Sequence, residues 1–131
     1  MITAVDTNVL LDVFGGDERH GLESLERLRR AYDEGAVIIC DIVYAELVPA
    51  FDDRVILDRA LQEINVTPSP TTRDIAYEAG LRWQRYRRIG GPRQRIITDF
   101  VIGAHAVIAA EFFLTRDRGF YVNYFPELSD A

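Results

Sequence analysis

Short apolar runs are spaced along the chain between longer stretches in which apolar residues recur every three or four positions. The runs at 2–5, 37–40 and 112–115 are rich in residues that favour extended backbone, so they predict buried strands. A briefer strand is predicted at 64–67. Strand and helix then alternate throughout, which predicts an α/β fold with a parallel sheet between helices.

The longer stretches have the spacing of amphipathic helices. They predict helices at 9–14, 22–32, 42–48, 57–64, 71–89 and 98–110. Glu23 and Arg27 are four residues apart, as expected for an ion pair on a solvated helix face. Asp41 is expected to cap the third of these helices.

The long helix at 71–89 has the clearest start and end signals. Thr71 and Asp74 have the spacing of a capping box, and Gly90, Gly91 and Pro92 stop the helix. Its predicted core face consists of Ile75, Ala79, Trp83 and Tyr86.

The helix at 98–110 is apolar nearly all round, which predicts burial between two layers. The exceptions are Asp99 and His105, and His105 is interpreted as a satisfied core residue. The aromatic tail at 120–128 is expected to cover a sheet edge.

Composition supports one soluble globular domain spanning residues 1–131. The 131 residues are 48% hydrophobic, enough for a sizeable core. Cys40 is the only cysteine, so no internal disulfide can form, which fits a reducing cytoplasm. The N-terminus does not have the pattern of a signal peptide, and the apolar run at 100–110 is too short to span a bilayer.

The charge balance is acidic and unusual. There are 21 acidic residues against 15 basic ones, a net charge of −6, and every basic residue is arginine. Chemistry that needs a lysine amine is therefore excluded. The net charge argues against non-specific coating of nucleic acid, but it allows a local basic track.

Four acidic residues share one predicted position. Asp6 ends the first strand, Glu46 lies in the helix after the second, Asp99 opens the buried helix, and Asp117 follows a late strand. All four map to the carboxyl-end edge of a parallel sheet, where ligands bind in open α/β folds. For Asp6 alone, a helix cap is the simpler interpretation.

Asp99 is flanked by apolar residues, so we expect it to be the least solvated of the four. A helix-dipole role would explain Asp99 but not the convergence of four acids. Clustered carboxylates repel one another unless a cation lies among them, and oxygen-only ligands suit Mg²⁺ or Mn²⁺. Zinc is disfavoured, because no Cys/His ligand spacing occurs.

A divalent ion held by these acids would activate water and neutralise charge on a phosphoryl oxygen. The sequence has no evident Ser-His-Asp or Cys-His arrangement and no glycine-rich phosphate loop. Asn8 and Thr115 are candidates for orienting the water or a carboxylate. A turn residue and a strand end are equally good interpretations of these two.

These residues together resemble a known family. The segment Asp6-Thr7-Asn8, Glu46, Asp99 and the run at 115–120 are similar to the PIN-domain pattern, and in particular to VapC-type toxin ribonucleases of toxin–antitoxin pairs. The resemblance covers the whole chain. It implies a three-layer α/β/α domain with strand order 3-2-1-4-5, and RNA cleavage that depends on Mg²⁺ or Mn²⁺. It also implies a cognate antitoxin, a homodimer, and Asp6, Glu46, Asp99 and Asp117 as catalytic, metal-binding acids.

Six of the fifteen arginines lie between positions 82 and 95. Arg82, Arg85 and Arg88 recur every third residue and predict a stripe on the long helix. With Arg93, they are candidates for holding RNA phosphates. The alternative is a solvated helix surface.

Other functions remain open from the residues alone. A metal-dependent phosphatase would also use acids at strand ends, although Asn8 stands where a second acid would be wanted. A non-catalytic module that grips a partner through an acidic groove is the alternative outside enzymology. Metal-dependent activity would separate an enzyme from such a module.

Overall fold

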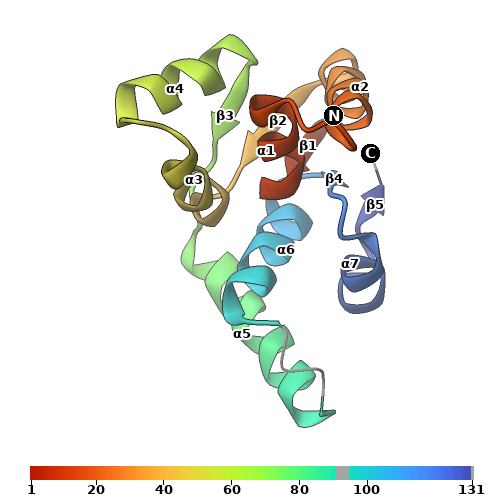
Figure 1. The fold of residues 1–131 in the computed structure, drawn as a ribbon. Coiled ribbons are helices and arrows are strands. Elements are labelled where there is room, and N and C mark those ends of the chain that lie inside the picture. Colours follow the sequence, from red (N-terminus) through yellow and green to blue (C-terminus); the bar gives the residue numbers. More distant parts are fainter. Residues whose placement is uncertain (91–94, 131) are drawn as a thin grey trace.

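A computed structural model describes residues 1–90 and 95–130 of the chain, with β5 described as backbone only. Figure 1 shows helices packed around a small sheet. The strands are β1 (Ile2–Val5), β2 (Ala36–Ile39), β3 (Val66–Pro68), β4 (Phe112–Leu114) and β5 (Ser129–Asp130). The helices are α1 (Thr7–Gly15), α2 (Gly21–Glu34), α3 (Asp41–Leu47), a 3₁₀ turn η1 (Val48–Ala50), α4 (Arg54–Glu63), α5 (Arg73–Arg88), α6 (Ile97–Ala109) and α7 (Arg118–Tyr124).

The sheet confirms the predicted topology. Its strand order is β3-β2-β1-β4-β5, and each neighbouring pair is parallel. The connections run outward from β1 to β3 and then reverse to β4 and β5. Right-handed crossovers therefore place α1 to α4 on one face of the sheet and α5 to α7 on the other, which gives the three-layer architecture.

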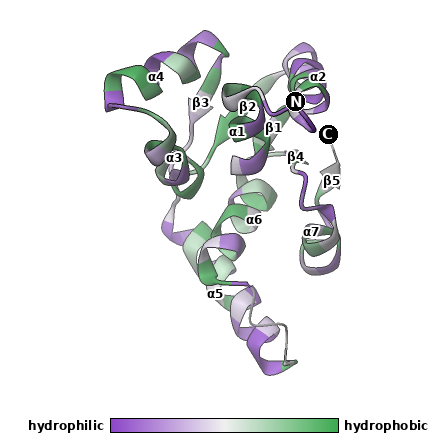
Figure 2. Cartoon of the chain, viewed as in Figure 1, coloured by the Kyte–Doolittle hydropathy of each residue, from purple (hydrophilic) through white to green (hydrophobic). Residues whose placement is uncertain are grey.

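The core lies on both sides of the sheet, where the apolar faces of the helices meet the strands (Figure 2). Its largest fully buried side chains include Leu10, Leu28, Ile39, Leu57, Phe100 and Phe125. Gly103 in α6 allows a close approach, because a Cβ atom there would lie 2.5 Å from the Phe125 ring. None of the helices in the ranges 1–90 and 95–130 is both long and apolar enough to cross a membrane.

Two helix starts differ from the prediction. The N-cap of α5 is Thr72, not Thr71, because the Thr72 backbone is extended and its hydroxyl accepts a hydrogen bond from the Ile75 N–H. Cys40 occupies the N-cap position of α3. Asp41 is already helical, and its carboxylate accepts from the Thr71 N–H at 2.9 Å instead of capping its own helix.

The edges of the fold also differ. β3 begins at Val66, because residues up to Glu63 remain helical and Asn65 adopts a positive φ of 52°. The aromatic tail does not simply cover an edge: it folds into α7, and the chain continues as the edge strand β5. In α5, Trp83 is only half-buried and the Arg87 guanidinium lies over its ring.

Two polar side chains lie deeper than predicted or lack a partner. Arg27 is buried, not solvated, and donates to the Thr115 carbonyl oxygen at 3.3 Å. His105 is buried in α6 as expected, but its Nε2 has no hydrogen-bond partner among residues 1–90 and 95–130, so within this part of the chain it is not satisfied. Burial lowers the pKa of His105, which keeps the imidazole neutral.

Candidate active site

Asp6 lies at the point where the sheet topology reverses. Its N–H donates to the Leu114 carbonyl oxygen at 2.9 Å, which joins the carboxyl ends of β1 and β4. Open α/β sheets bind ligands at such a switch point. Asp6 also caps α1, because its Oδ1 accepts from the Thr7 N–H at 2.8 Å. Asp6 therefore caps α1 and also lies at the candidate site.

Two threonines connect the acids. The Thr115 hydroxyl donates to Asp6 Oδ2 at 2.7 Å and accepts from the Asp117 N–H at 2.9 Å. The Thr7 hydroxyl donates to Glu46 Oε1 at 2.7 Å. These hydrogen bonds hold Asp6, Glu46 and the Asp117 backbone in a fixed relation, as a site with orienting hydrogen bonds requires.

Asn8 has one strong and one weak contact at the site. Its Oδ1 accepts from the Arg116 N–H at 3.2 Å, and its Nδ2 lies 3.4 Å from Asp6 Oδ2. Asn8 thus steadies the turn after β4 and faces Asp6, in agreement with an orienting role.

Asp6 is an unfavourable place for a negative charge. The side chain is only 7% exposed, and burial raises its pKa from 3.8 to about 6. The hydrogen bonds from Thr115 and Thr7 oppose this rise, whereas the nearby Glu46 and Asp117 carboxylates add to it. A bound cation would relieve this cost directly.

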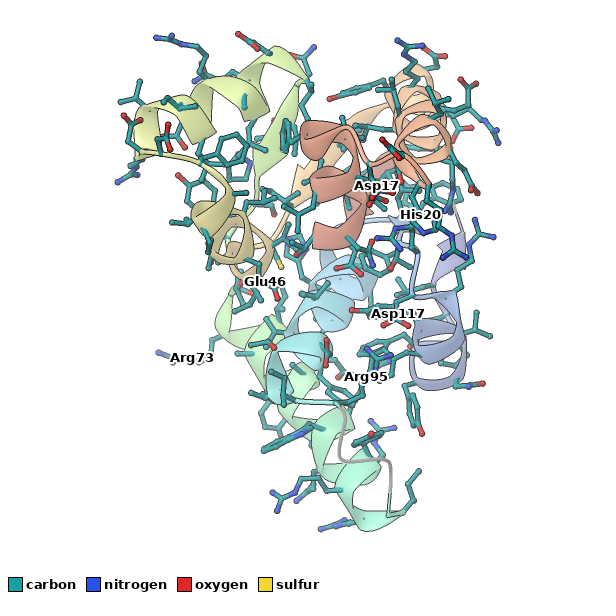
Figure 3. The ribbon with its side chains drawn as sticks, in the orientation of Figure 1. Asp17, His20, Glu46, Arg73, Arg95 and Asp117 are labelled. Atoms are coloured by element: carbon teal, nitrogen blue, oxygen red, sulfur yellow. The ribbon has the colours of Figure 1, made fainter. Side chains whose placement is uncertain are left out.

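The other acids surround Asp6 at different depths. Glu46 is exposed on α3, and Asp117 is half-buried at the start of α7 (Figure 3). Tyr121 is buried near three of these acids: burial and the charges of Asp6, Asp99 and Asp117 all raise its pKa. Among residues 1–90 and 95–130, however, no three acid, histidine or cysteine side chains lie close enough to hold a metal ion as they stand.

Asp99 is not the least solvated acid, contrary to the prediction. It is half-buried, and its Oδ2 accepts from the Ile96 N–H at 3.1 Å. The Asp99 N–H in turn donates to the Ile96 carbonyl oxygen at 3.1 Å. In this arrangement the carboxylate closes the start of α6, while its charge still acts on Arg95 and Tyr121.

An ion pair between a buried aspartate and a more exposed arginine fixes the turn that carries Thr115 and Asp117. Asp12 in α1 is 4% exposed and accepts from Arg116 Nε at 2.6 Å and Nη2 at 3.0 Å. The Ser24 hydroxyl of α2 also donates to Asp12, at 2.7 Å. We call Asp12, Arg116 and Ser24 the α1 clamp, since it ties the turn after β4 to α1 and α2.

Breaking the α1 clamp should destabilise the protein. Arg116→Ala leaves the Asp12 carboxylate buried with Ser24 as its remaining clamp partner, so we expect the free energy of unfolding to fall by about 2 kcal/mol. Urea denaturation measures the change. The double variant Asp12→Asn, Arg116→Ala removes the charge that was stranded and should recover part of the loss. An unchanged denaturation midpoint in Arg116→Ala would contradict this account.

The predicted arginine stripe divides into two parts. The Arg82 guanidinium is engaged in contacts within the protein. It pairs with Glu78 at 2.8 Å, donates to both carboxylate oxygens of Glu127 and lies over the Phe125 ring. Arg85 and Arg88 are exposed along a groove of 530 Å³ between α5 and α7. Arg93 lies outside the described residues.

Sequence reasoning missed several residues of the site. The sequence pattern includes Thr7 only as the middle residue of the segment Asp6-Thr7-Asn8. It places Tyr121 in the aromatic tail and predicts no function for Asp12. Arg95 is among the six arginines between positions 82 and 95 but is not one of the predicted site residues, and it pairs with Asp117, with 3.0 Å between Nη2 and Oδ1. A polar residue after a predicted strand was a usable signal for Thr7, but nothing local distinguishes Asp12 or Tyr121.

Comparison with solved structures shows the same fold over the full chain. VapBC2 from Rickettsia felis, solved bound to a DNA fragment from their promoter, superposes with a TM-score of 0.74 at 17% identity, covering 100% of this chain and 98% of that one. VapBC-1 from nontypeable Haemophilus influenzae gives 0.74 and 17%, with 100% and 97% coverage. A toxin–antitoxin complex from Klebsiella pneumoniae gives 0.67 and 20%, with 97% and 95% coverage.

Comparison by sequence gives the family. A search of curated proteins returned no match. The family model of the PIN domain matches residues 3–126, nearly the whole chain, and this range includes all four acids. The chain therefore belongs to the PIN domain family.

Proposed function

We propose that this protein is an endoribonuclease that depends on Mg²⁺ or Mn²⁺ and acts on cytoplasmic RNA. The observation that carries the proposal is Asp6, a buried carboxylate at the topological switch point with a pKa raised to about 6 and two further acids close enough to raise it. Such a group is typical of a site whose charge is balanced by a bound cation. Membership of the PIN domain family supports the nuclease assignment.

The donor set suits a hard divalent ion. Asp6, Glu46, Asp99 and Asp117 offer only oxygen ligands, which Mg²⁺ and Mn²⁺ prefer, and solvent can reach the exposed Glu46 and the half-buried Asp117. The ion would supply an activated water and charge neutralisation at the scissile phosphate.

The chain's own residues orient the acids. Thr115 fixes Asp6 Oδ2 and the Asp117 backbone, while Thr7 fixes Asp6 Oδ1 and Glu46. Since the carboxylate of Asp6 is held from two sides, its remaining lone pairs are pre-oriented for a ligand. This arrangement avoids reorganisation of Asp6 during the reaction.

RNA would approach along the groove between α5 and α7. Arg85 and Arg88 provide exposed guanidinium groups there, and Tyr86 and Tyr124 also contribute to its lining. Guanidinium groups bind phosphate oxygens in a bidentate manner. We include Arg93 in this track on its position in the sequence alone.

We further propose that the chain is the toxin of a type II toxin–antitoxin pair and forms a homodimer. Its support is the family resemblance and the full-length structural likeness to VapBC and toxin–antitoxin complexes. The antitoxin is expected to place a cationic side chain, such as arginine, into the acidic site. Electrostatic complementarity of this kind sets partner choice and association rate.

Metal dependence is the direct test of the enzyme. Purified protein should cleave single-stranded RNA with Mg²⁺ or Mn²⁺ and lose all cleavage in excess EDTA, with products carrying 5′-phosphate ends. Full cleavage in EDTA, or 2′,3′-cyclic phosphate ends, would contradict the proposal. Metal-dependent release of phosphate from a monoester without RNA cleavage would instead favour a phosphatase, and binding without any turnover would favour a partner-binding module.

A further inference from the structure

Arg95 occupies the carboxylate of Asp117. Its Nη1 lies 2.5 Å from Asp117 Oδ2 and its Nη2 lies 3.0 Å from Oδ1, so the guanidinium contacts both carboxylate oxygens (Figure 3). The guanidinium also stacks over the Phe120 ring, 4.2 Å from its centroid. Arg95 is thus held in one orientation by a charge and by a ring.

This pairing places a fixed positive charge where a divalent ion would bind. Both oxygens of Asp117 face Arg95, and the Asp99 carboxylate also acts on the guanidinium. A divalent ion at Asp117 would meet a like charge within a few ångströms, and the two repel at that range.

We propose that Arg95 is the resident counter-cation of Asp117, which a divalent ion must displace, and that the displaced guanidinium then binds the substrate phosphate. The inference rests on the proposed function, because it takes Asp117 as a ligand of the ion. Arg95 would therefore exchange one oxyanion for another during the reaction cycle.

The exchange is physically easy. The side chains of Arg95 and Asp117 are 28% and 33% exposed, so water can reach both groups and replace their contacts as the pair opens. The Phe120 ring contacts the guanidinium independently of Asp117, so it can keep Arg95 beside the site after Asp117 has turned away. Arginine suits both partners, because its fork matches carboxylate and phosphate equally.

The test measures metal affinity without RNA. Calorimetric titration of Mn²⁺ into wild type and Arg95→Gln should give a dissociation constant about fivefold lower in the variant, because the competing cation is gone. Arg59→Gln on the exposed face of α4 removes the same charge away from the acids and should leave the affinity unchanged. Arg95→Lys keeps the positive charge but loses the forked guanidinium, so its affinity for Mn²⁺ should lie between those of wild type and Arg95→Gln.

A second measurement addresses the phosphate. At saturating Mn²⁺, Arg95→Gln should raise the KM for RNA more than it lowers kcat, and Arg95→Lys should restore part of the loss. An unchanged or weaker Mn²⁺ affinity in Arg95→Gln, with binding intact in wild type, would overturn this inference alone. Failure of wild type to bind Mn²⁺ would overturn the metal mechanism of the proposed function as well.

Discussion

Asp6→Asn should abolish RNA cleavage and at the same time make the metal-free protein more stable. The substitution keeps the shape of the side chain but removes a charge that burial and two neighbouring carboxylates oppose. We expect activity to fall at least about 100-fold, since loss of a residue that binds the metal should cost more than loss of a residue that only orients a metal ligand. In a bacterial host, expression of wild type should arrest growth, and Asp6→Asn at equal soluble level should not.

The stability gain should depend on pH. The pKa of Asp6 is 3.8 in the unfolded chain and about 6 in the folded one, so the folded state binds the extra proton between these values. The free energy of unfolding of the wild type therefore falls as pH rises from about 4 to about 6. Above about pH 6, Asp6 is ionised in both states and this destabilisation is at its full value. Asp6→Asn avoids it and should be about 1–3 kcal/mol more stable at pH 7.5.

Thermal melts in EDTA at pH 4 and pH 7.5 measure this difference. The two proteins should melt alike at pH 4 and diverge at pH 7.5. Asp52→Asn, an exposed acid ahead of α4, provides the matched control and should show no such divergence. Added Mg²⁺ should stabilise wild type but not Asp6→Asn, because an ion that binds the native state shifts the folding equilibrium. A variant less stable than wild type at both pH values would leave Asp6 as a helix cap alone.

Gly103→Ala should have the largest effect on stability among single-methyl substitutions in α6. A Cβ at Gly103 would meet three atoms of the Phe125 ring at 2.5–2.7 Å. That ring cannot withdraw, because it is fully buried, packs against the Phe120 and Tyr121 rings and carries Arg82 on its face. Overpacking should outweigh the better helix propensity of alanine and cost about 2 kcal/mol, or about 7 °C in Tm.

Gly80→Ala is the matched control for this substitution. Gly80 also lies within a helix, α5, but a Cβ there has no neighbouring atom within 4 Å. It should gain about 0.5–1 kcal/mol from the loss of backbone freedom in the unfolded chain. Phe125→Leu added to Gly103→Ala should recover part of the lost stability. If both glycine variants shift Tm in the same direction, the close packing of α6 on Phe125 is not the cause.

The sequence predicted most of the fold because its signals are local. Apolar runs such as 37–40 and glycines such as Gly35 mark elements by themselves, and strand ends of a parallel sheet meet at one edge. The same reasoning placed Asp6 and Asp117 correctly at that edge. Element boundaries failed where two neighbouring residues offer equivalent chemistry, as Thr71 and Thr72 do.

The contacts that tune the site could not be predicted from sequence. Arg116 pairs with Asp12 across 104 positions and Arg27 reaches the Thr115 carbonyl across 88, and no local pattern encodes such partners. The prediction that Asp99 is the least solvated acid is wrong because residues next to one another in the sequence need not surround one another in space. In a helix, position 99 projects differently from positions 100 and 102, so its carboxylate turns back to the Ile96 N–H.

The central position of β1 has a consequence for how the protein is made. β1 precedes the other four strands of the sheet in the sequence, yet one of its neighbours is β4, and Asp6 is held by Leu114 and Thr115. A nascent chain therefore lacks these partners of Asp6 until residues 114 and 115 have been synthesised, and such long-range contacts form late in folding. Synthesis of the turn after β4 is therefore the step at which Asp6 acquires its contacts with Leu114 and Thr115.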